Sequence, residues 1–422
     1  MIKGEKIRFD IHKILYSIYK YNKTLNNVDI KKIINKHKKE DIAFLNNVSL
    51  NTMRFYFLSI KIIERYVTKS IKDKEKVLLL SAITQIVFLN FKEYAVINCS
   101  VEIAKKLNIY HGFINAILKE ISKNKESLRN IKVDFNDFPD WFKNKAVSLS
   151  DSEKKKFLEN YNKKPSLHIV FKNKEKLNSF EEGIIKTSEI SGFLIKNRDI
   201  TEIESFKNGD WWVQDFSSFF PLHNLQIMKN HKKFLDACAA PGGKSFQLLS
   251  KKLKLTLNDK SSSRIKILKS NLNRLNYNTK VLNEDFTTFK ENEKYDFVIV
   301  DAPCSSIGTI RKNPEIFFKN KGPDFLALNT LQKKMLNKAA KLLNVNGLIL
   351  YMVCSFLKNE TKDQVNNFIM ERKDFEIHDF DLITQDSEYL KLLNNNFMIT
   401  LPETIKKNNI DGYFAVYLKK IK

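Results

Sequence analysis

The chain has 422 residues and a mass of 49.5 kDa, too long for one ordinary hydrophobic core, so two or three domains are expected. Its formal net charge of +25 favours nucleic acid as a partner, although only nine of the 73 basic residues are arginine and an A/T-rich coding sequence would also accumulate lysine. No apolar stretch is long enough to cross a membrane, no secretory signal follows the amino terminus, and four dispersed cysteines form neither a disulfide framework nor a zinc motif. These features predict a cytoplasmic protein that binds neither a membrane nor a metal.

Residues 1–130 have the spacing of amphipathic helices. Stretches such as "TMRFYFLSIKIIERYV" and "EKVLLLSAITQIVFLNF" place apolar residues three and four positions apart, and glycine is nearly absent. A compact all-α domain is therefore predicted, with Val77–Leu89 as a buried helix. Residues 131–210 read as a polar connector followed by a small mixed α/β subdomain, in which "SLHIVF" and "GFLI" are strand candidates.

Residues 211–422 alternate apolar strands with helical stretches, which predicts βαβ units and a parallel, Rossmann-like sheet. The strands are expected at "KFLDACA", "LKLTLND", "TKVLNED", "YDFVIVDAP" and "GLILYMVCS", and the late segments "FEIHDF" and "YFAVYLKK" complete the sheet. Open α/β sheets bind ligands at the carboxyl ends of their strands. Four strands bring an aspartate to that edge, namely Asp236, Asp259, Asp285 and Asp301.

The stretch "CAAPGGKS", residues 238–245, resembles a phosphate-binding P-loop but departs from it at two places. Cys238 stands where the first glycine belongs, and Pro241 removes one N–H donor. Asp259 follows Asp236 by 23 residues, near the interval at which a carboxylate grips a ribose hydroxyl. S-adenosylmethionine carries a sulfonium, an ammonium and ribose hydroxyls, all suited to acidic residues. The pattern favours a methyl-donor loop, and a nucleotide triphosphatase is the weaker alternative.

The motif "DAPCSS" and a second cysteine at position 354 point to the atom that receives the methyl group. Cytosine C5 is not nucleophilic by itself, but attack of a thiolate on C6 turns C5 into an enamine carbon. A carboxylic acid near N3 stabilises the charge that develops on the ring, and a second residue helps elimination. Asp301, Cys304 and Cys354 are the right residue types on neighbouring strand ends. The alternative is that both cysteines are small buried hydrophobic residues.

The segments "FLDACAAPGGKS", "DFVIVDAPCSSIGTIRKNPEI" and "LYMVCSF" together resemble the Sun-type family of RNA (cytosine-5) methyltransferases. The segments "SAITQIVFLNFKEYAVINCSVEIAKKL" and "FINAILKEI" resemble the NusB-like RNA-binding domain of the RsmB branch, which acts on cytosine in 16S ribosomal RNA. The resemblance implies a NusB-like domain over residues 1–130, a connecting subdomain over 131–210 and a class I methyltransferase domain over 211–422. It also implies S-adenosylmethionine as cofactor and RNA as partner, and we expect a monomer.

Carried over by position, the family's nucleophile falls on Cys354 and its product-releasing cysteine on Cys304. The resemblance assigns Asp259 to the ribose and Asp285 to the adenine, and places Asp301 beside both the donor and the target base. The remaining donor-loop residues that it implies are Cys238, Ala239, Ala240, Pro241, Gly242, Gly243 and Lys244. The chain departs from the family at Val353, where threonine is usual, so a lost hydroxyl could slow the reaction.

Two other functions fit parts of the sequence. An RNA-binding assembly factor with a vestigial methyltransferase domain would tolerate the departure at position 353. A DNA cytosine-5 methyltransferase would use the Pro-Cys cysteine, Cys304, as its nucleophile. Outside the motifs, Trp211 and Trp212 are expected to pack between subdomains and Arg264 to be a solvated helix residue. Arg311 and Lys312 are expected to meet phosphate.

Overall fold

The computed structural model describes residues 3–196, 199–223, 232–290, 293–380, 386–394 and 396–422. Contacts divide the chain into two units, Met1–Val147 with Ile310–Pro323 and Ser148–Thr309 with Asp324–Lys422. The three-domain division at 1–130, 131–210 and 211–422 stays a prediction. Among the described helices, none is long and apolar enough to cross a membrane.

The first unit is helical throughout its described residues, as the sequence predicts for positions up to 130. Isoleucine and leucine at three- and four-residue spacing form one core, and Val77–Val87 is buried along its whole length. The helices are α1 Lys3–Tyr21, α2 Val28–Ile34, α3 Lys39–Arg54, α4 Tyr56–Tyr66, α5 Asp73–Ile83, the π-helix η1 Thr84–Phe88, α6 Glu93–Lys106, α7 His111–Lys123, α8 Lys125–Leu128, η2 Phe135–Asp137 and α9 Asp140–Lys145.

The segment Ile310–Pro323 belongs to this helical unit, although it lies far along the chain. It contains α16 (Glu315–Phe318), and the Phe318 ring packs edge-on against the rings of Tyr19 and Tyr56 at centroid distances of 5.6 and 5.4 Å. The guanidinium of Arg54 donates a hydrogen bond to the carbonyl of Arg311 across 3.0 Å. Arg311 is itself fully buried, so the expectation that it meets phosphate is wrong.

The second unit begins with α10 (Asp151–Asn160) and a small antiparallel sheet of order β2-β3-β1-β4. The strands are β1 His168–Phe171, β2 Ile184–Ser188, β3 Ser191–Leu194 and β4 Trp211–Val213, with the short helices α11 Lys174–Asn178, η3 Ile200–Glu202 and α12 Glu204–Lys207. Both tryptophans of β4 are buried, and the Trp212 ring lies 5.7 Å from that of Phe246 in the large α/β layer. This confirms packing between the two layers for Trp212, whereas the Trp211 ring packs inside the core of the small sheet.

The large sheet has nine strands within the described residues, in the order β11-β12-β15-β9-β8-β5-β6-β7 with β10 paired to β15. The strands are β5 Phe234–Asp236, β6 Leu255–Asn258, β7 Lys280–Leu282, β8 Tyr295–Asp301, β9 Leu343–Val353, β10 Phe375–His378, β11 Leu393–Asn394, β12 Phe397–Thr400 and β15 Tyr413–Lys420. Among the strands that the structure describes, only β5 to β9 pair in parallel. Because β15 runs antiparallel to β9, the sheet is mixed, which corrects the fully parallel sheet of the sequence analysis.

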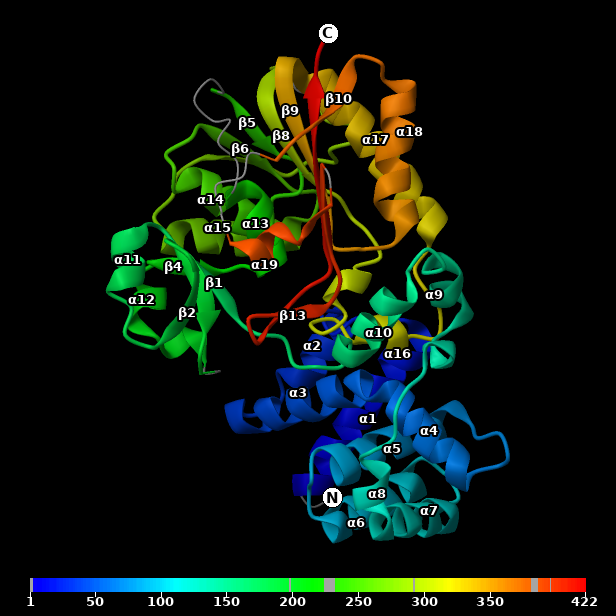
Figure 1. Ribbon diagram of the computed structural model, residues 1–422. Coiled ribbons are helices and arrows are strands. Elements are labelled where there is room, and N and C mark those ends of the chain that lie inside the picture. Colours follow the sequence, from blue (N-terminus) through cyan, green and yellow to red (C-terminus); the bar gives the residue numbers. More distant parts are fainter. Residues whose placement is uncertain (1–2, 197–198, 224–231, 291–292, 381–385, 395) are drawn as a thin grey trace. The chain divides into compact units, whose positions relative to one another are not determined.

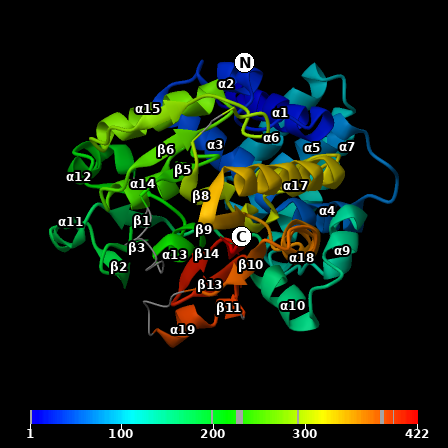
Figure 2. The same cartoon turned by 90° about the horizontal axis from the view of Figure 1, so that it is seen from above.

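Helices cover both faces of the large sheet (Figure 1). The helices α13 Phe216–His223, α14 Gly243–Leu249 and α15 Ser262–Arg274 cover one face, and α17 Phe325–Leu342 and α18 Lys362–Glu371 the other. Figure 2 shows the same two helical layers from above. Strand residues alternate between the layers: Phe297 and Ile299 face one, Val298 and Val300 the other. The Rossmann-like methyltransferase fold is confirmed. The remaining elements are η5 Ile307–Thr309, η6 Lys358–Glu360, α19 Ser387–Leu390 and the hairpin β13 Glu403–Ile405 with β14 Asn408–Ile410.

Candidate active site

The strand order reverses at β5, which pairs with β6 on one side and with β8 on the other. A crevice forms at the carboxyl ends of strands where an open sheet reverses its order. The loop after β5 carries the predicted donor loop, β8 ends at Asp301, and β9 leads directly into Cys354. The topology therefore gathers the predicted site residues at one edge of the sheet.

The donor loop turns sharply at Gly242 into α14. Gly242 has φ +119°, and a Cβ there would lie 2.0 Å from the Phe246 ring, so only glycine fits. Asp236, at the end of β5, is fully buried and accepts a hydrogen bond from Ser245 Oγ across 2.6 Å. Burial raises the pKa of Asp236 to about 6. Asp236 therefore stabilises the loop through its hydrogen bond with Ser245, and it is not one of the carboxylates accessible to a ligand.

Asp259 and Arg264 hold the donor loop from the neighbouring strand. The Asp259 carboxylate, nearly buried, accepts hydrogen bonds from the backbone N–H of Ala240 at 3.2 Å and of Ser261 at 2.9 Å. The Arg264 guanidinium lies 3.3 Å from that carboxylate and also donates to the Ala240 carbonyl. Arg264 is thus a solvated helix residue, as expected, with its side chain 51% exposed, and it also binds the loop.

Asp285 follows β7 and is more open than Asp259. Its carboxylate lies 2.7 Å from the Lys260 ammonium and accepts hydrogen bonds from Thr287 through both N–H and Oγ1. The hydrogen bond from Lys260, followed by those from Thr287, lowers the pKa of Asp285 to about 2. Asp285 is therefore an anion at the rim of the sheet edge at neutral pH.

Lys244, Asp301 and Tyr413 form a closed triangle of polar contacts. The Lys244 ammonium donates to Asp301 at 2.7 Å and to the Tyr413 hydroxyl at 3.0 Å, and that hydroxyl donates to the other Asp301 oxygen at 2.8 Å. Sequence reasoning missed Tyr413, because it lies on β15, far along the chain, with no motif around it. Lys244 is engaged inside the protein, with its side chain 11% exposed, and is not presented to a polyphosphate as a P-loop lysine would be.

The two predicted catalytic cysteines lie side by side. Their sulfur atoms are 3.3 Å apart, and Cys354 Sγ is also 3.4 Å from Ser306 Oγ. The backbone N–H of Gly308 donates to the Cys354 carbonyl, which ties the two loops together. The hydrogen bond to Cys354, and then burial, raise the pKa of Cys304 well above its usual range. Burial also raises the pKa of Cys238 far above its usual range, so Cys238 is a protonated thiol of the donor loop.

The residues present fit S-adenosylmethionine by their chemistry. Carboxylates at three strand ends, each paired with a cation of the chain, keep lone pairs that can accept hydrogen bonds from ribose hydroxyls and from an ammonium group. The glycine turn at position 242 brings the backbone close to the same edge. Among the described residues, no group of three or more His, Cys, Asp or Glu side chains is placed to hold a metal ion.

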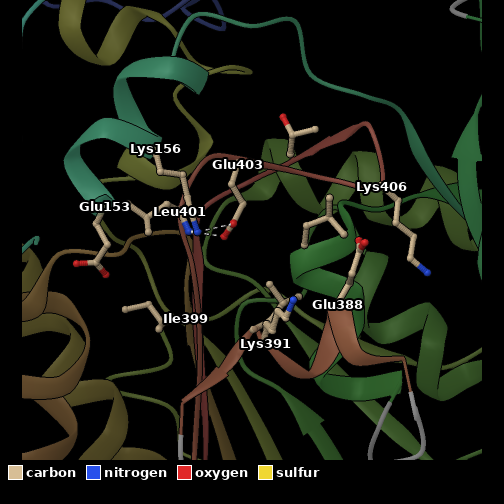
Figure 3. A pocket seen from close by; sticks show the side chains of 11 residues that line it. Glu153, Lys156, Glu388, Lys391, Ile399, Leu401, Glu403 and Lys406 are labelled. Atoms are coloured by element: carbon tan, nitrogen blue, oxygen red, sulfur yellow. Dashed lines mark hydrogen bonds and ion pairs between the residues drawn. The ribbon is translucent and has the colours of Figure 1, made fainter. Parts of the chain in front are cut away.

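A pocket of about 510 Å³ lies in the second unit and contains none of the predicted site residues (Figure 3). Lys156 of α10 and Glu403 of β13 form a 2.9 Å ion pair across it. Acidic and basic side chains alternate around its wall, and the labelled ones are Glu153, Lys156, Glu388, Lys391, Glu403 and Lys406. This balance of charge gives no preference for an anion such as RNA.

Known proteins identify the two regions of the chain. Residues 224–419 match the family model of the 16S rRNA methyltransferase RsmB/F, and residues 6–123 match that of the NusB family. Residues 224–419 therefore belong to the RsmB/F methyltransferase family, and residues 6–123 to the NusB family. The chain is 25% identical over 410 residues to ribosomal RNA small subunit methyltransferase B of Pasteurella multocida, and the alignment covers 91% of this chain and 89% of that protein. It is 25% identical over 404 residues to the protein of the same name from Shewanella oneidensis, and the alignment covers 90% of this chain and 91% of that protein.

Solved structures share the fold of this chain. The crystal structure of PH0851 has a TM-score of 0.72 at 19% identity, with 100% of this chain and 99% of that one covered. A methyltransferase homologue from Pyrococcus horikoshii has a TM-score of 0.52 at 19% identity, and the superposition covers 67% of this chain and 95% of that one. The chain is thus an S-adenosylmethionine-dependent ribosomal RNA methyltransferase with a NusB-type amino-terminal region.

Proposed function

We propose that the protein transfers a methyl group from S-adenosylmethionine to C5 of a cytosine in RNA, namely 16S ribosomal RNA, through a covalent adduct between Cys354 and C6. The observation that carries this proposal is the 3.3 Å separation of the Cys304 and Cys354 sulfur atoms beside Asp301. Two thiols at neighbouring strand ends supply one nucleophile and one group for release. Bound S-adenosylmethionine supplies the electrophilic methyl group.

The first half of the proposed reaction activates C5. The Cys354 thiolate forms a bond to C6, and the electrons of the C5–C6 double bond move into the ring, where N3 takes up a proton. Asp301, paired with Lys244, is the group that we assign to N3, because the pair can pass a proton and compensate the changing charge. C5 is then an enamine carbon and can accept the methyl group.

The second half releases the product. The proton on C5 must leave, the bond between C6 and Cys354 must break, and N3 must return its proton. We assign the C5 proton to Cys304. The hydrogen bond to Cys354 is the largest cause of its raised pKa, and this bond is lost when the Cys354 sulfur is used in the adduct. For this step the Cys304 thiol first gives its own proton to water. The thiolate then takes the C5 proton, the electrons of the C5–H bond re-form the C5–C6 double bond, and the Cys354 thiolate leaves C6.

Val353, the departure from the family pattern, is fully buried on β9 in the core beneath α17 and α18. Its side chain packs in that core, away from the crevice. A threonine hydroxyl at this position would therefore act only through packing, and we expect no loss of the chemical step from its absence.

The proposal is tested with a 16S ribosomal RNA transcript and three single variants. Cys354→Ala should give neither methylation nor a covalent protein–RNA species. Cys304→Ala should still allow attack and methyl transfer, so a slowly migrating adduct accumulates on a denaturing gel. Cys99→Ser, a cysteine on α6 of the helical unit, is the matched control and should behave like the wild type. Trapping by Cys354→Ala with a clean loss of adduct in Cys304→Ala would assign the nucleophile to Cys304 and contradict the proposal.

A further inference from the structure

One buried carboxylate joins the loops that carry the two cysteines. Glu360, in η6, is fully buried. Its Oε1 accepts a hydrogen bond from the backbone N–H of Ser305 at 2.7 Å, and its Oε2 accepts from Ser305 Oγ at 2.5 Å and Ser355 Oγ at 2.7 Å. Ser305 directly follows Cys304, and Ser355 directly follows Cys354. The carboxylate therefore spans the two residues next to the cysteines.

The surroundings of Glu360 hold it in place. Gln332 of α17, also fully buried, donates to Glu360 Oε1 at 3.3 Å and to the carbonyl of Pro303 at 3.0 Å. The Tyr351 hydroxyl donates to the Glu360 carbonyl at 2.8 Å. Pro303 and Ser305 flank Cys304 on both sides, so one network fixes its backbone.

In the described part of the chain, the Glu360 carboxylate has hydrogen-bond donors on both oxygens but no cationic partner within ion-pair distance. Burying an anion without a cation is costly, and a neutral side chain of similar volume would fill the same space more cheaply. The donors come from the two cysteine loops and from α17, which packs beneath them. This points to a function that needs the loops fixed relative to each other.

We infer that Glu360 is a positioning residue that sets the separation of Cys304 and Cys354. The inference rests on the proposed function, because it is the chemistry of the two cysteines that needs this separation. Glu360 contacts neither sulfur and acts only through Ser305 and Ser355. Reacting groups displaced by about 1 Å can lose about 100-fold in rate, so loss of the hydrogen bonds from Ser305 and Ser355 to Glu360 should slow the reaction strongly.

The first test measures geometry without methylation. Diamide oxidises two neighbouring thiols to a disulfide and is itself reduced. The rate is followed across pH, so that variants are compared at equal thiolate fraction and the rate of Cys304–Cys354 cross-linking reports how well the sulfurs are held. Glu360→Gln keeps the shape but removes the charge, and its cross-linking should be about tenfold slower than that of the wild type. Glu371→Gln is the matched control, because this glutamate of α18 is half-exposed and pairs with Lys333, and it should cross-link like the wild type. Equal or faster cross-linking in Glu360→Gln overturns the inference.

The second test measures methylation of a 16S ribosomal RNA transcript. In Glu360→Gln, kcat should fall about 10- to 100-fold, while KM for the RNA and Kd for S-adenosylmethionine stay within about twofold. Ser305→Ala and Ser355→Ala should each lower kcat, and their effects should not add to that of Glu360→Gln, because all three residues act through one network. An unchanged kcat, or additive effects, overturns the inference. If the wild type does not methylate this RNA at all, the proposed function fails, while the cross-linking result still decides the role of Glu360.

Discussion

The ammonium of Lys244 lies 2.7 Å from the carboxylate of Asp301, and this ion pair joins the donor loop to the end of β8. The side chains are 11% and 28% exposed, so water screens the pair only partly. Tyr413 closes the arrangement through its hydroxyl, which contacts both partners. The proposed donor side and the proposed base side of the reaction therefore share one polar group.

Tyr413→Phe should weaken binding of S-adenosylmethionine about tenfold, because the lost hydroxyl bonds to two charged groups and such bonds are worth about 1.5–3 kcal/mol. Isothermal calorimetry measures the donor Kd directly. Tyr417→Phe is the matched control on the same strand, since the Tyr417 hydroxyl donates to the carbonyl of Pro221, and it should leave donor affinity unchanged. The same Kd for Tyr413→Phe and the wild type would show that the triangle does not support donor binding.

The sequence could predict what lies within continuous motifs. The proposed donor loop, Asp301 and both cysteines can be predicted from the sequence, because each lies at the end of an apolar strand and parallel strands bring such ends together. Tyr413 and Glu360 were not found. Tyr413 reaches Asp301 only because β15 inserts antiparallel beside β9, and the sequence does not show that order. Glu360 lies in a polar stretch, "LKNETKD", that is typical of an exposed helix start.

Charge patterns were less informative than apolar patterns. Arg311 follows the cysteine loop in a basic stretch and was assigned to phosphate, yet it is buried because its segment belongs to the helical unit. Arg264 is solvated as expected, with its side chain 51% exposed, and the sequence does not show that it also holds the donor loop through Ala240 and Asp259. A long cationic side chain can extend over the surface to bond a neighbouring loop, or it can be buried in the interior. The position of the residue in the sequence does not distinguish these two outcomes.

Asp236→Asn should change how stability depends on pH. The folded-state pKa of Asp236 is raised to about 6 by burial, above its ordinary value near 3.8. The folded state then holds a proton that the unfolded state releases, so this stabilisation is complete below about pH 4 and is lost as pH rises through 6. The loss amounts to about 3 kcal/mol, and Asp236→Asn should gain stability relative to the wild type by about that amount between pH 4 and 7.

The control for this measurement is Asp285→Asn, where the sign is opposite. The pKa of Asp285 is lowered to about 2, so its carboxylate contributes stability above about pH 4 and loses it as pH falls through 2. Between pH 4 and 7, the difference in unfolding free energy between Asp285→Asn and the wild type should stay constant. Urea unfolding at several pH values measures both differences. A constant difference for Asp236→Asn as well would contradict the raised pKa.

Gly308→Ala should disturb the loop that follows Cys304. A Cβ at Gly308 would lie 1.9 Å from the carbonyl oxygen of Gly412, and backbone cannot move aside as a flexible side chain can. We expect a loss of stability of about 1–3 kcal/mol or more and slower methylation. Gly4→Ala in α1 is the matched control, since its nearest neighbour is 3.4 Å away and alanine favours a helix by about 1 kcal/mol. Equal effects of the two substitutions on the thermal midpoint would refute this prediction.

Removal of residues 1–130 should leave donor binding intact but expose an apolar segment. Phe317 and Phe318 of α16 are buried within the helical unit, where they pack against Phe57, Tyr19 and Tyr56. Without those helices Phe318 loses both ring partners, while Phe317 keeps Phe138, Trp141 and Phe142 of the retained chain. More apolar surface is then exposed, and exposed apolar patches promote association. The truncated chain should therefore aggregate in size-exclusion chromatography.

Replacing Phe317 and Phe318 by serine should restore a monodisperse truncated chain whose Kd for S-adenosylmethionine lies within about twofold of that of the full chain. The same two substitutions in the full chain should destabilise the helical unit by several kcal/mol, about 3–5 for each buried ring removed.

The truncation should also flatten the plot of log K for RNA against log salt, because the removed region carries basic residues that displace counterions. A truncated chain that is soluble with both phenylalanines in place would show that residues 1–130 do not cover this segment. Loss of donor binding together with RNA binding would show that the two activities depend on one cooperative core.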